Sequence, residues 1–272
     1  MIIHNEHKVF DHVAIMLQYH YSNDPMYDNV VFVLGYNVMR SLDPVRKKYP
    51  RKKIIVFQLE QLFEGAIWAK KYLGSVLRTA DEVWDYDEEN IIFMKQWYKV
   101  EAKMHPMLYA PTLKTIKMKP YDQRDIDVLF YGYTFERRAK FLFKLQHELA
   151  NKWSVYDIYG VFGEPLDDLI SRSKIIVNVH SKSIARQEQV RMMYPVVNNC
   201  CVVSEKDKRD YMSDSVISIE YDEMAKKIKD LLVSGQWRNQ CEIAESRWRS
   251  ISHFRESKLV SMGMRSPNTK SV

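Results

Sequence analysis

The 272-residue sequence predicts an α/β protein built from two similar halves, each with a parallel sheet covered by helices. Short apolar runs alternate along the chain with segments whose apolar residues recur at helical spacing, a pattern typical of βα units. A polar stretch with one proline, KTIKMKPYDQR at residues 114–124, interrupts this alternation near the middle. Apolar residues make up 46% of the chain and aromatic residues 12%, which excludes a disordered chain.

The first half carries five predicted strands with helical segments between them. The strands are expected at residues 1–3, 29–35, 52–60, 82–86 and 107–113, and the helices at 9–20, from Pro44, at 66–78 and at 88–99. Helices that connect successive strands favour a parallel sheet with both faces covered. We therefore expect residues 1–113 to form a first Rossmann-like domain, followed by a linker at 114–124.

A second series of βα units follows the linker. Strands are expected at residues 126–131, 155–159, 174–179, 200–204 and 216–219, and helices at 135–151, 165–173, 184–196 and 222–234. Residues 125–235 are therefore expected to form a second domain. The helical pattern at 236–260 carries Trp237, Trp248 and Phe254, so we expect it to return to the first domain. Residues 261–272 are polar and are expected to form a flexible tail.

Composition narrows the class of protein. No apolar run approaches the roughly 20 residues that a membrane span needs, and the first residues lack a signal-peptide pattern, so a cytoplasmic location is expected. Cys200, Cys201 and Cys241 offer neither a disulfide framework nor a C-x-x-C metal spacing. The net charge of +6 favours a solvated surface first, a phosphate-binding field second and nucleic acid last. We expect a monomer or weak dimer without a nucleic-acid partner.

The turns after the second-half strands are candidates for phosphate binding, because ligands of parallel sheets lie beyond the carboxyl ends of the strands. Gly132 ends one strand, Tyr133 follows, and Thr134 is expected to cap the next helix. Arg137 and Arg138 lie in the first turn of that helix, where cations are unfavourable unless an anion binds. A bound diphosphate and an exposed arginine pair both remain open.

Three further segments of this half carry polar or loop-forming residues. Gly160 to Gly163 encloses Val161 and Phe162, which suits either the sandwiching of a flat base or an ordinary turn. His180 ends a strand and can donate to a phosphate or a sugar hydroxyl. Glu188 follows Ser183, early in the predicted helix, and can accept hydrogen bonds from two ribose hydroxyls. The alternative for Glu188 is a surface carboxylate paired with Arg191 or Arg186.

The order of these features is more specific than any one of them. The segments DVLFYGY..ERR, VFGEPLDDLISRSKIIVNVH and QEQVRMMYPVVNNCCVVSE resemble the donor-binding half of GT-B glycosyltransferases, in particular the compact type of large DNA viruses and bacteria. KKIIVFQLEQL and ADEVWDYDEENI resemble the acceptor-side domain. The resemblance covers about residues 50–260. The sequence departs from the pattern at Tyr133, where a serine is common, and at Asn198-Asn199.

The resemblance implies two domains that face a cleft and an inverting transfer from a UDP-sugar to a glycan. Glu188 would hold the ribose, Gly132 to Thr134 and Arg138 would line the diphosphate, and Gly160 to Phe162 would hold the base. No metal or other cofactor is expected, because no predicted strand of the second half ends in the D-x-D pattern that binds Mn²⁺ in the other glycosyltransferase class. A resemblance to chlorella-virus xylosyltransferases that act on a capsid N-glycan implies UDP-xylose as donor and a fucose as acceptor.

An inverting transfer also needs a general base for the acceptor hydroxyl, which we expect from a loop of the first domain. The candidates are Glu60 and Glu6, followed by His7. Apolar neighbours could raise the pKa of Glu60 by desolvation, but Glu60 could equally bond the backbone of the next helix. A different class also remains open: a non-catalytic two-domain protein that binds a nucleotide or a sugar.

Overall fold

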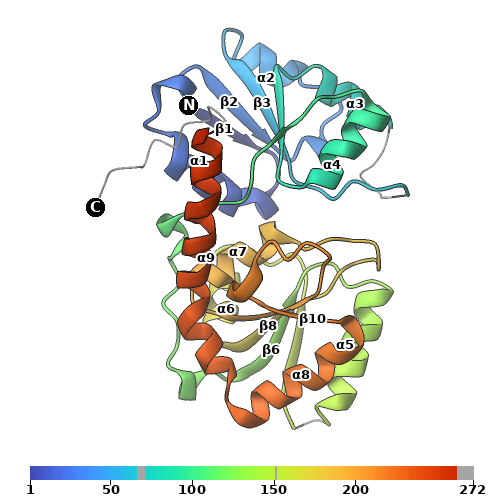
Figure 1. Cartoon of the computed structure of the whole chain (residues 1–272), viewed down its shortest axis with the longest axis vertical. Helices are drawn as coiled ribbons and strands as arrows, with labels where there is room; N and C mark the ends of the chain where they lie inside the picture. The colour runs from blue at the N-terminus through green and yellow to red at the C-terminus, as the bar shows by residue number, and fades with distance from the viewer. Residues whose placement is uncertain (66–70, 151, 262–272) are drawn as a thin grey trace. The chain divides into compact units, whose positions relative to one another are not determined.

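The computed structural model describes residues 1–65, 71–150 and 152–261 (Figure 1). These residues form two compact units. Of the described residues, unit 1 comprises those within 1–112 and 253–261, and unit 2 comprises those within 113–252. Each unit contains a five-stranded sheet in which every strand pairing is parallel. The predicted α/β class with two parallel sheets is therefore confirmed.

The strands of unit 1 follow one another across the sheet in chain order. They are β1 (Ile2–Asn5), β2 (Val30–Leu34), β3 (Lys53–Gln58), β4 (Glu82–Asp85) and β5 (Lys103–Met104). The helices are α1 (Asp11–Tyr21), α2 (Asp43–Lys48), α3 (Lys71–Arg78) and α4 (Glu88–Phe93), with a π-helical turn at Met94–Tyr98. The start predicted for α3 lies outside the described residues.

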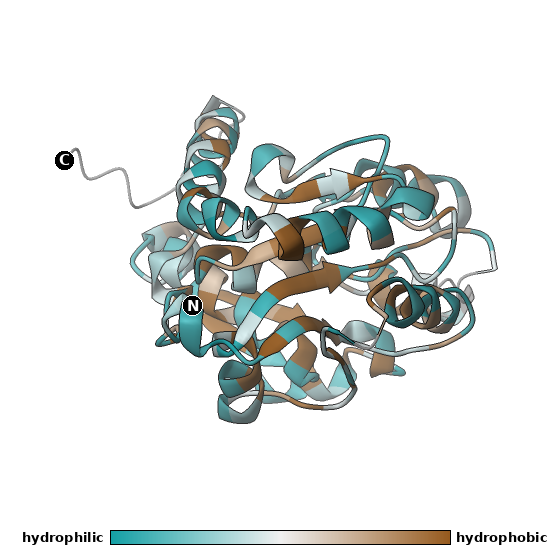
Figure 2. Cartoon of the chain, turned by 90° about the horizontal axis from the view of Figure 1, so that it is seen from below, coloured by the Kyte–Doolittle hydropathy of each residue, from teal (hydrophilic) through white to brown (hydrophobic). Residues whose placement is uncertain are grey.

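Alternation along the strands builds a core on each face of this sheet. Val31 and Val33 of β2 pack with residues of α2 and α3 in one cluster. Phe32, between them in the chain, contacts Tyr21 of α1 and Trp84 of β4 on the other face. A period of two places successive side chains on opposite faces, so both faces of these strands are buried. Figure 2 shows the strands as largely hydrophobic and the helices as mixed.

The prediction of a strand at residues 107–113 is wrong. The last described strand of unit 1 is Lys103–Met104, and residues 111–113 form a 3-10 turn. Met107 and Leu108 are fully buried, and the Leu108 amide donates to the sulfur of Met16 rather than to a neighbouring strand. The apolar pattern therefore reflects burial without sheet pairing, and periodicity alone does not separate the two.

Unit 2 repeats the βα alternation with a different strand order. Its strands are β6 (Ile126–Tyr131), β7 (Val155–Ile158), β8 (Ser173–Asn178), β9 (Cys201–Glu205) and β10 (Ile217–Ile219). Its helices are α5 (Arg137–Glu148), α6 (Glu164–Ser171), α7 (Gln189–Val197), α8 (Tyr221–Ser234) and α9 (Trp237–Ser261). One core cluster joins the inward faces of α5 and α8 to β6, β8 and β9.

The order in which the chain adds strands to the unit 2 sheet reverses at β6, although all the strands remain parallel. The order across the sheet is β10-β9-β8-β6-β7, so the chain adds β7 on one side of β6 and then crosses to the other side for β8. The loops after β6 and β8 therefore leave the sheet toward opposite faces. In open parallel sheets such a reversal marks the place where ligands bind, beyond the carboxyl ends of the two strands. The unit 1 sheet has no such reversal among its described strands.

Helix α9 belongs to both units, as the fold prediction required. Trp237 is buried in the unit 2 core, and from His253 onward the helix is part of unit 1. There Arg255 donates to the Met107 carbonyl at 3.1 Å and Leu259 is buried. Phe254 was expected to pack but is 63% exposed. None of the helices in the described residues is long and apolar enough to cross a membrane.

Candidate functional site

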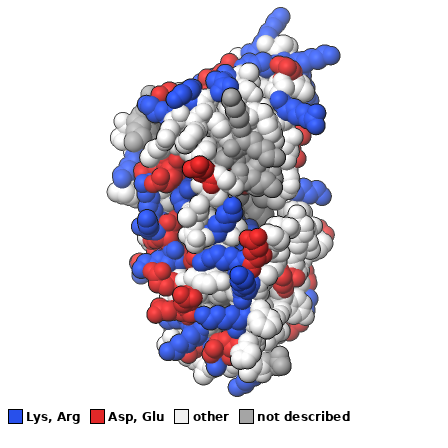
Figure 3. All heavy atoms as spheres, turned by 90° about the vertical axis from the view of Figure 1, so that its right-hand side faces the viewer, with Lys and Arg blue, Asp and Glu red and all other residues white. Residues whose placement is uncertain are grey.

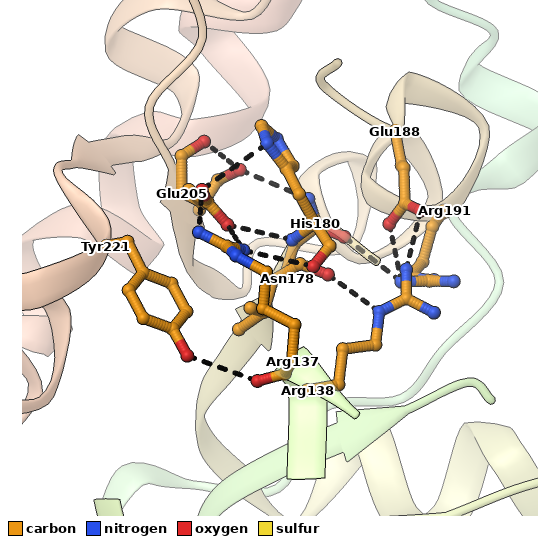
Figure 4. Close-up of polar contacts among 10 residues, drawn as sticks. Arg137, Arg138, Asn178, His180, Glu188, Arg191, Glu205 and Tyr221 are labelled. Carbon is orange, nitrogen blue, oxygen red and sulfur yellow. Dashed lines mark hydrogen bonds and ion pairs between the residues drawn. The ribbon is translucent and has the colours of Figure 1, made fainter. Parts of the chain in front are cut away.

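Two arginines and a glutamate meet where the unit 2 sheet reverses (Figure 4). Arg138 of α5 donates from Nη2 to Oε1 of Glu188 at 2.6 Å, and Arg191 of α7 donates from Nη1 to Oε2 at 2.6 Å. Arg191 Nη1 also lies 3.2 Å from the Asn178 side-chain oxygen at the end of β8. The sequence predicted Arg138 and Glu188 as site residues, and the structure brings them into direct contact.

Glu188 ends the loop before α7 rather than lying within the helix. The helix begins at Gln189, and Glu188 occupies the N-cap position without capping it through its side chain. Burial disfavours the charged carboxylate, but Arg191 and Arg138 outweigh burial and hold the pKa of Glu188 below its usual range. Glu188 therefore carries a negative charge at neutral pH, with each oxygen engaged by one arginine.

Arg138 and Arg191 differ in how much of each guanidinium is already engaged. Arg138 is 6% exposed and also donates to the carbonyls of Val179 and Tyr133, at 2.8 Å and 3.0 Å. Arg191 is 21% exposed, and its described hydrogen bonds use only Nη1. A guanidinium has five N–H donors, so Arg191 has more donors left for an anion than Arg138 does. Sequence reasoning named Arg191 only as a possible partner of Glu188.

Gly132 provides space for Arg191. Its φ of +146° is one that side chains rarely adopt, and a Cβ added there would lie 2.9 Å from Arg191 Nη2. The Gly132 amide donates to the Ile158 carbonyl at 2.9 Å, so this N–H is used within the sheet. Gly132 therefore contributes the absence of a side chain, which lets the guanidinium approach the end of β6.

The N-terminus of α5 has no side-chain cap. Thr134 was expected to supply it, but the helix begins at Arg137, and the Thr134 hydroxyl instead donates to Asp157 at 2.6 Å. The N-cap residue is Glu136, with φ +41° and no capping hydrogen bond, and the first turn contains no acidic residue. The first N–H groups of a helix carry partial positive charge, so this end favours an anion.

Arg137 has a structural set of partners. Its guanidinium forms two hydrogen bonds to Glu205, at 2.5 Å and 2.6 Å, and stacks 3.7 Å from the centre of the Tyr221 ring. It also donates to the His180 carbonyl at 3.1 Å. Arg137 therefore ties together the ends of β8 and β9, as Figure 4 shows, and its own charge is neutralised by Glu205.

His180 is buried at the same edge, with one ring nitrogen unpaired. The side chain is 2% exposed, and Nδ1 lies 3.6 Å from Glu205 Oε1. Burial lowers the pKa of His180, so the ring is neutral at neutral pH. Nε2 has no hydrogen-bond partner among the residues that the structure describes. Because buried polar atoms are nearly always paired, an unpaired Nε2 beside this cluster points to a missing ligand.

The remaining unit 2 candidates lie in the loops around this cluster. Tyr133 is 58% exposed, and its ring lies 6.0 Å from Phe135 in a stacked arrangement and 5.5 Å from Tyr159. Val161 and Phe162 are partly buried in the loop after β7, and Ser183 is exposed in the loop before Glu188. No hydrogen bond among the described residues ties Ser183 to the arginines.

The three base candidates of unit 1 differ in accessibility. Glu60 is partly buried after β3, and its backbone is held by Gln58 and Asn90. Glu6 is exposed and bonded to His4 Nε2 at 2.5 Å. His7 accepts the Val9 amide at Nδ1, which places the proton of the neutral ring on Nε2 and leaves no free basic nitrogen. The geometry therefore favours Glu60 over His7 as the general base.

Charged side chains are mixed on the face shown in Figure 3, where acidic and basic groups alternate. Many of the surface cations have acidic neighbours; Arg46, for example, pairs with Asp81, and Lys53 pairs with Glu82. No group of three or more metal-binding side chains occurs within residues 1–65, 71–150 and 152–261.

No protein-family model matches this sequence. An uncharacterized protein of Acanthamoeba polyphaga mimivirus is 26% identical over 189 residues, which are 66% of this chain and 62% of that protein. The chain thus spans less than two thirds of that relative. HepE of Anabaena, solved in complex with UDP and glucose, has a TM-score of 0.56 at 10% identity, over 86% of this chain and 78% of that one.

A mutant of TarM from S. aureus, solved in complex with fondaparinux, α-GlcNAc-glycerol and UDP, has a TM-score of 0.57 at 11% identity. That match covers 86% of this chain and 55% of TarM. Identities this low show the fold alone. The two parallel five-stranded sheets with their surrounding helices therefore have the GT-B fold.

Proposed function

We propose that this protein is a glycosyltransferase that moves a sugar from a UDP-sugar to a hydroxyl of a glycan, with unit 2 binding the donor. The observation that carries the proposal is the meeting of Arg138, Glu188 and Arg191 at the reversal of the unit 2 sheet. Ligands of parallel α/β sheets bind at this position, and the chemistry gathered there suits a nucleoside diphosphate.

The cationic side of the cluster would hold the diphosphate. Arg191 has unused donors, and the uncapped N-terminus of α5 lies at the same strand end. Arginine binds phosphate through two parallel N–H groups, and helix N-termini add backbone donors. The same groups would stabilise UDP as it leaves, so transfer would not need a metal.

Glu188 would bind the ribose hydroxyls through the hydrogen-bond acceptor sites that the two arginines leave unused. A carboxylate offers about four acceptor sites, and the two ion pairs occupy one on each oxygen. The Glu188 side chain is 19% exposed, so part of it remains open. The base would lie against the exposed rings near Tyr133 and the loop with Val161 and Phe162, where aromatic faces favour stacking.

Glu60 would act as general base in an inverting transfer. Its carboxylate would take the proton of the acceptor hydroxyl while the acceptor oxygen attacks the anomeric carbon. The bond from that carbon to the diphosphate oxygen breaks, and UDP leaves with the bonding electron pair. A positioned general base contributes typically 10²–10⁴-fold to the rate. Glu6 is the second candidate, since its loop follows β1 at the same sheet edge.

UDP-xylose as donor and a fucose as acceptor are the specific form of this proposal. They rest on the sequence resemblance to viral xylosyltransferases. The UDP complexes of HepE and TarM agree with the general form only, and the mimivirus relative is uncharacterized.

A panel of nucleotide sugars tests the proposal. UDP and UDP-sugars should raise the melting temperature, because ligand at 100 times its Kd adds about 2.7 kcal/mol to the free energy of unfolding. Release of UDP in the presence of methyl fucoside would then identify the donor. Binding without turnover of any sugar would favour a non-catalytic binding protein. No stabilisation by any UDP compound would contradict the proposal.

A further inference from the structure

The carboxyl ends of β3 and β4 carry a fully buried polar cluster that the donor site does not involve. Gln58 and Asp85 end the two strands and stand opposite each other in the sheet register, and Asn90 lies in the first turns of α4. All three side chains are 0% exposed. Burying three polar side chains costs free energy unless each forms hydrogen bonds, so the partners of these three side chains matter.

The partners are mainly the backbone around Glu60. Gln58 donates from Nε2 to the Glu60 carbonyl at 2.6 Å and accepts the Glu60 amide at Oε1, also at 2.6 Å. Asn90 donates from Nδ2 to the same carbonyl at 2.9 Å and accepts the Leu62 amide at Oδ1 at 2.7 Å. The backbone N–H groups of Glu60 and Leu62 can only donate hydrogen bonds. The side-chain oxygens of Gln58 and Asn90 must therefore face these N–H groups, which fixes the orientation of both side-chain amides.

Asp85 completes the cluster by holding the two side-chain amides. Its Oδ2 accepts from Gln58 at 2.7 Å, and its Oδ1 accepts from Asn90 at 3.2 Å and from the Asp87 amide at 2.8 Å. Burial raises the pKa of Asp85 well above its usual range, and these three donors oppose that shift. Every polar side-chain atom of Gln58, Asp85 and Asn90 has a partner, and a fully paired buried network fixes one geometry.

We propose that Gln58, Asp85 and Asn90 are positioning residues that hold Glu60 in place as the general base. The inference rests on the proposed function, because it needs Glu60 to act on the acceptor. Four hydrogen bonds fix residues 60 and 62, while the flanking Leu59 and Leu62 side chains are buried and the Glu60 side chain stays partly exposed. A loop held this way keeps a carboxylate within the narrow geometry that proton transfer requires.

Amide hydrogen exchange tests directly whether Gln58 and Asn90 hold the backbone at Glu60 and Leu62 in place. Asn90→Ala should speed exchange at Leu62, and Gln58→Met should speed exchange at Glu60, each by about 10²-fold, because each variant removes the acceptor of that amide. Asp81→Ala is the matched control in the same unit. It removes the acceptor of the Ile54 amide at the other end of β3 and should leave Glu60 and Leu62 unchanged. Unchanged exchange in both test variants would overturn the proposal.

A double-mutant cycle tests whether the cluster acts through Glu60. With the UDP-sugar that wild type turns over in the panel, Asn90→Ala should lower kcat by about 10-fold and leave UDP affinity unchanged. In a Glu60→Gln background, Asn90→Ala should lower kcat no further, because the group that it positions is already gone. Gln58→Met is carried through the same cycle in case Asn90→Ala fails to fold.

Three results of the binding and turnover measurements would also overturn the proposal, and they are distinguishable. If Asn90→Ala lowered kcat as much in the Glu60→Gln background as in wild type, the cluster would have a structural role that does not act through Glu60. Full turnover by Glu60→Gln with normal UDP binding would remove Glu60 as the base while leaving the donor site intact. Absence of both UDP binding and turnover in wild type would remove the proposed function itself, and the positioning role with it.

Discussion

Arg138 of α5 and Glu188, immediately before α7, form an ion pair of 2.6 Å although they lie 50 residues apart in the chain. The arginine side chain is 6% exposed and the glutamate 19%. Because Arg191 engages the second oxygen of Glu188, one carboxylate pairs with two arginines, and the three side chains together keep a net charge of +1. Glu188 therefore stabilises unit 2 and, in the proposed function, binds the ribose.

Glu188→Gln should weaken UDP binding by about 10–100-fold, because hydrogen bonds to a charged group contribute about 1.5–3 kcal/mol. It should also lower the free energy of unfolding by about 3 kcal/mol, since the nearly buried Arg138 loses its counter-charge. Calorimetric titration and denaturant unfolding measure the two effects. Glu148→Gln, which breaks the surface pair with Lys229, should change neither. If Glu188→Gln bound UDP with wild-type affinity, the Glu188 carboxylate would have a structural role only.

Gly132→Ala should abolish UDP binding while Gly235→Ala should preserve it. Both glycines have φ values unfavourable for alanine, at +146° and +73°. Only at Gly132 would the new Cβ meet Arg191, at 2.9 Å, whereas a Cβ at Gly235, between α8 and α9, meets nothing closer than Arg238 Nη1 at 4.0 Å. The two variants thus share backbone strain and differ in the displacement of Arg191. Equal UDP affinity in both would show that Arg191 does not contact the donor.

UDP binding and transfer should both persist in EDTA. In the proposed function, Arg191 and the N-terminus of α5 neutralise the diphosphate, which a divalent cation does in metal-dependent enzymes. The measurement is titration of UDP into protein dialysed against EDTA, with and without added Mg²⁺ or Mn²⁺. Loss of affinity in EDTA, restored by either metal, would reject metal independence.

The stability of unit 1 should fall in acid because burial holds three of its histidines neutral. Burial lowers the pKa of His12 and that of His20 to about 4, and that of His105 to about 3, from an ordinary value of 6.5. The folded state keeps these rings neutral while the unfolded state binds protons, so their contribution is complete above pH 6.5 and is lost as pH falls through about 4 and 3. The slope should be up to about 1.4 kcal/mol per pH unit for each histidine.

Denaturant unfolding at a series of pH values measures this slope. His105 Nε2 lies 2.5 Å from the Tyr21 hydroxyl, and its ring stacks on Trp84, so His105→Gln should fold with lower stability but a shallower dependence on pH. His253→Asn, at a largely exposed position, should leave the slope as in wild type. A flat dependence of the free energy of unfolding between pH 6.5 and 4 in wild type would show that none of these histidines is held neutral.

Much of the fold follows from local sequence patterns. The apolar runs of β2, β3, β6 and β8 are buried on both faces, so each is nearly continuous and easy to identify. The error at residues 107–113 has the same origin, because that segment is equally apolar and buried without pairing in a sheet. Burial sets the apolar pattern, whereas strand pairing depends on neighbours distant in the chain.

The candidate site was predictable as a list of loops but not as a set of contacts. Glycine and polar residues at strand ends identified Gly132, His180 and Glu188. The roles of Arg191 and Asn178 depend on the reversal of the sheet at β6, which no local pattern indicates. Thr134 was expected to cap α5 on local grounds, but α5 begins later, at Arg137, and the Thr134 hydroxyl donates to Asp157 of the neighbouring strand.

A crystal structure with UDP bound tests the central claim most directly. The account predicts that the diphosphate contacts Arg191 and the first N–H groups of α5, and that the ribose hydroxyls lie within hydrogen-bond distance of Glu188. UDP bound at the end of the unit 1 sheet, or at any place without contacts to Arg191 and Glu188, would contradict it.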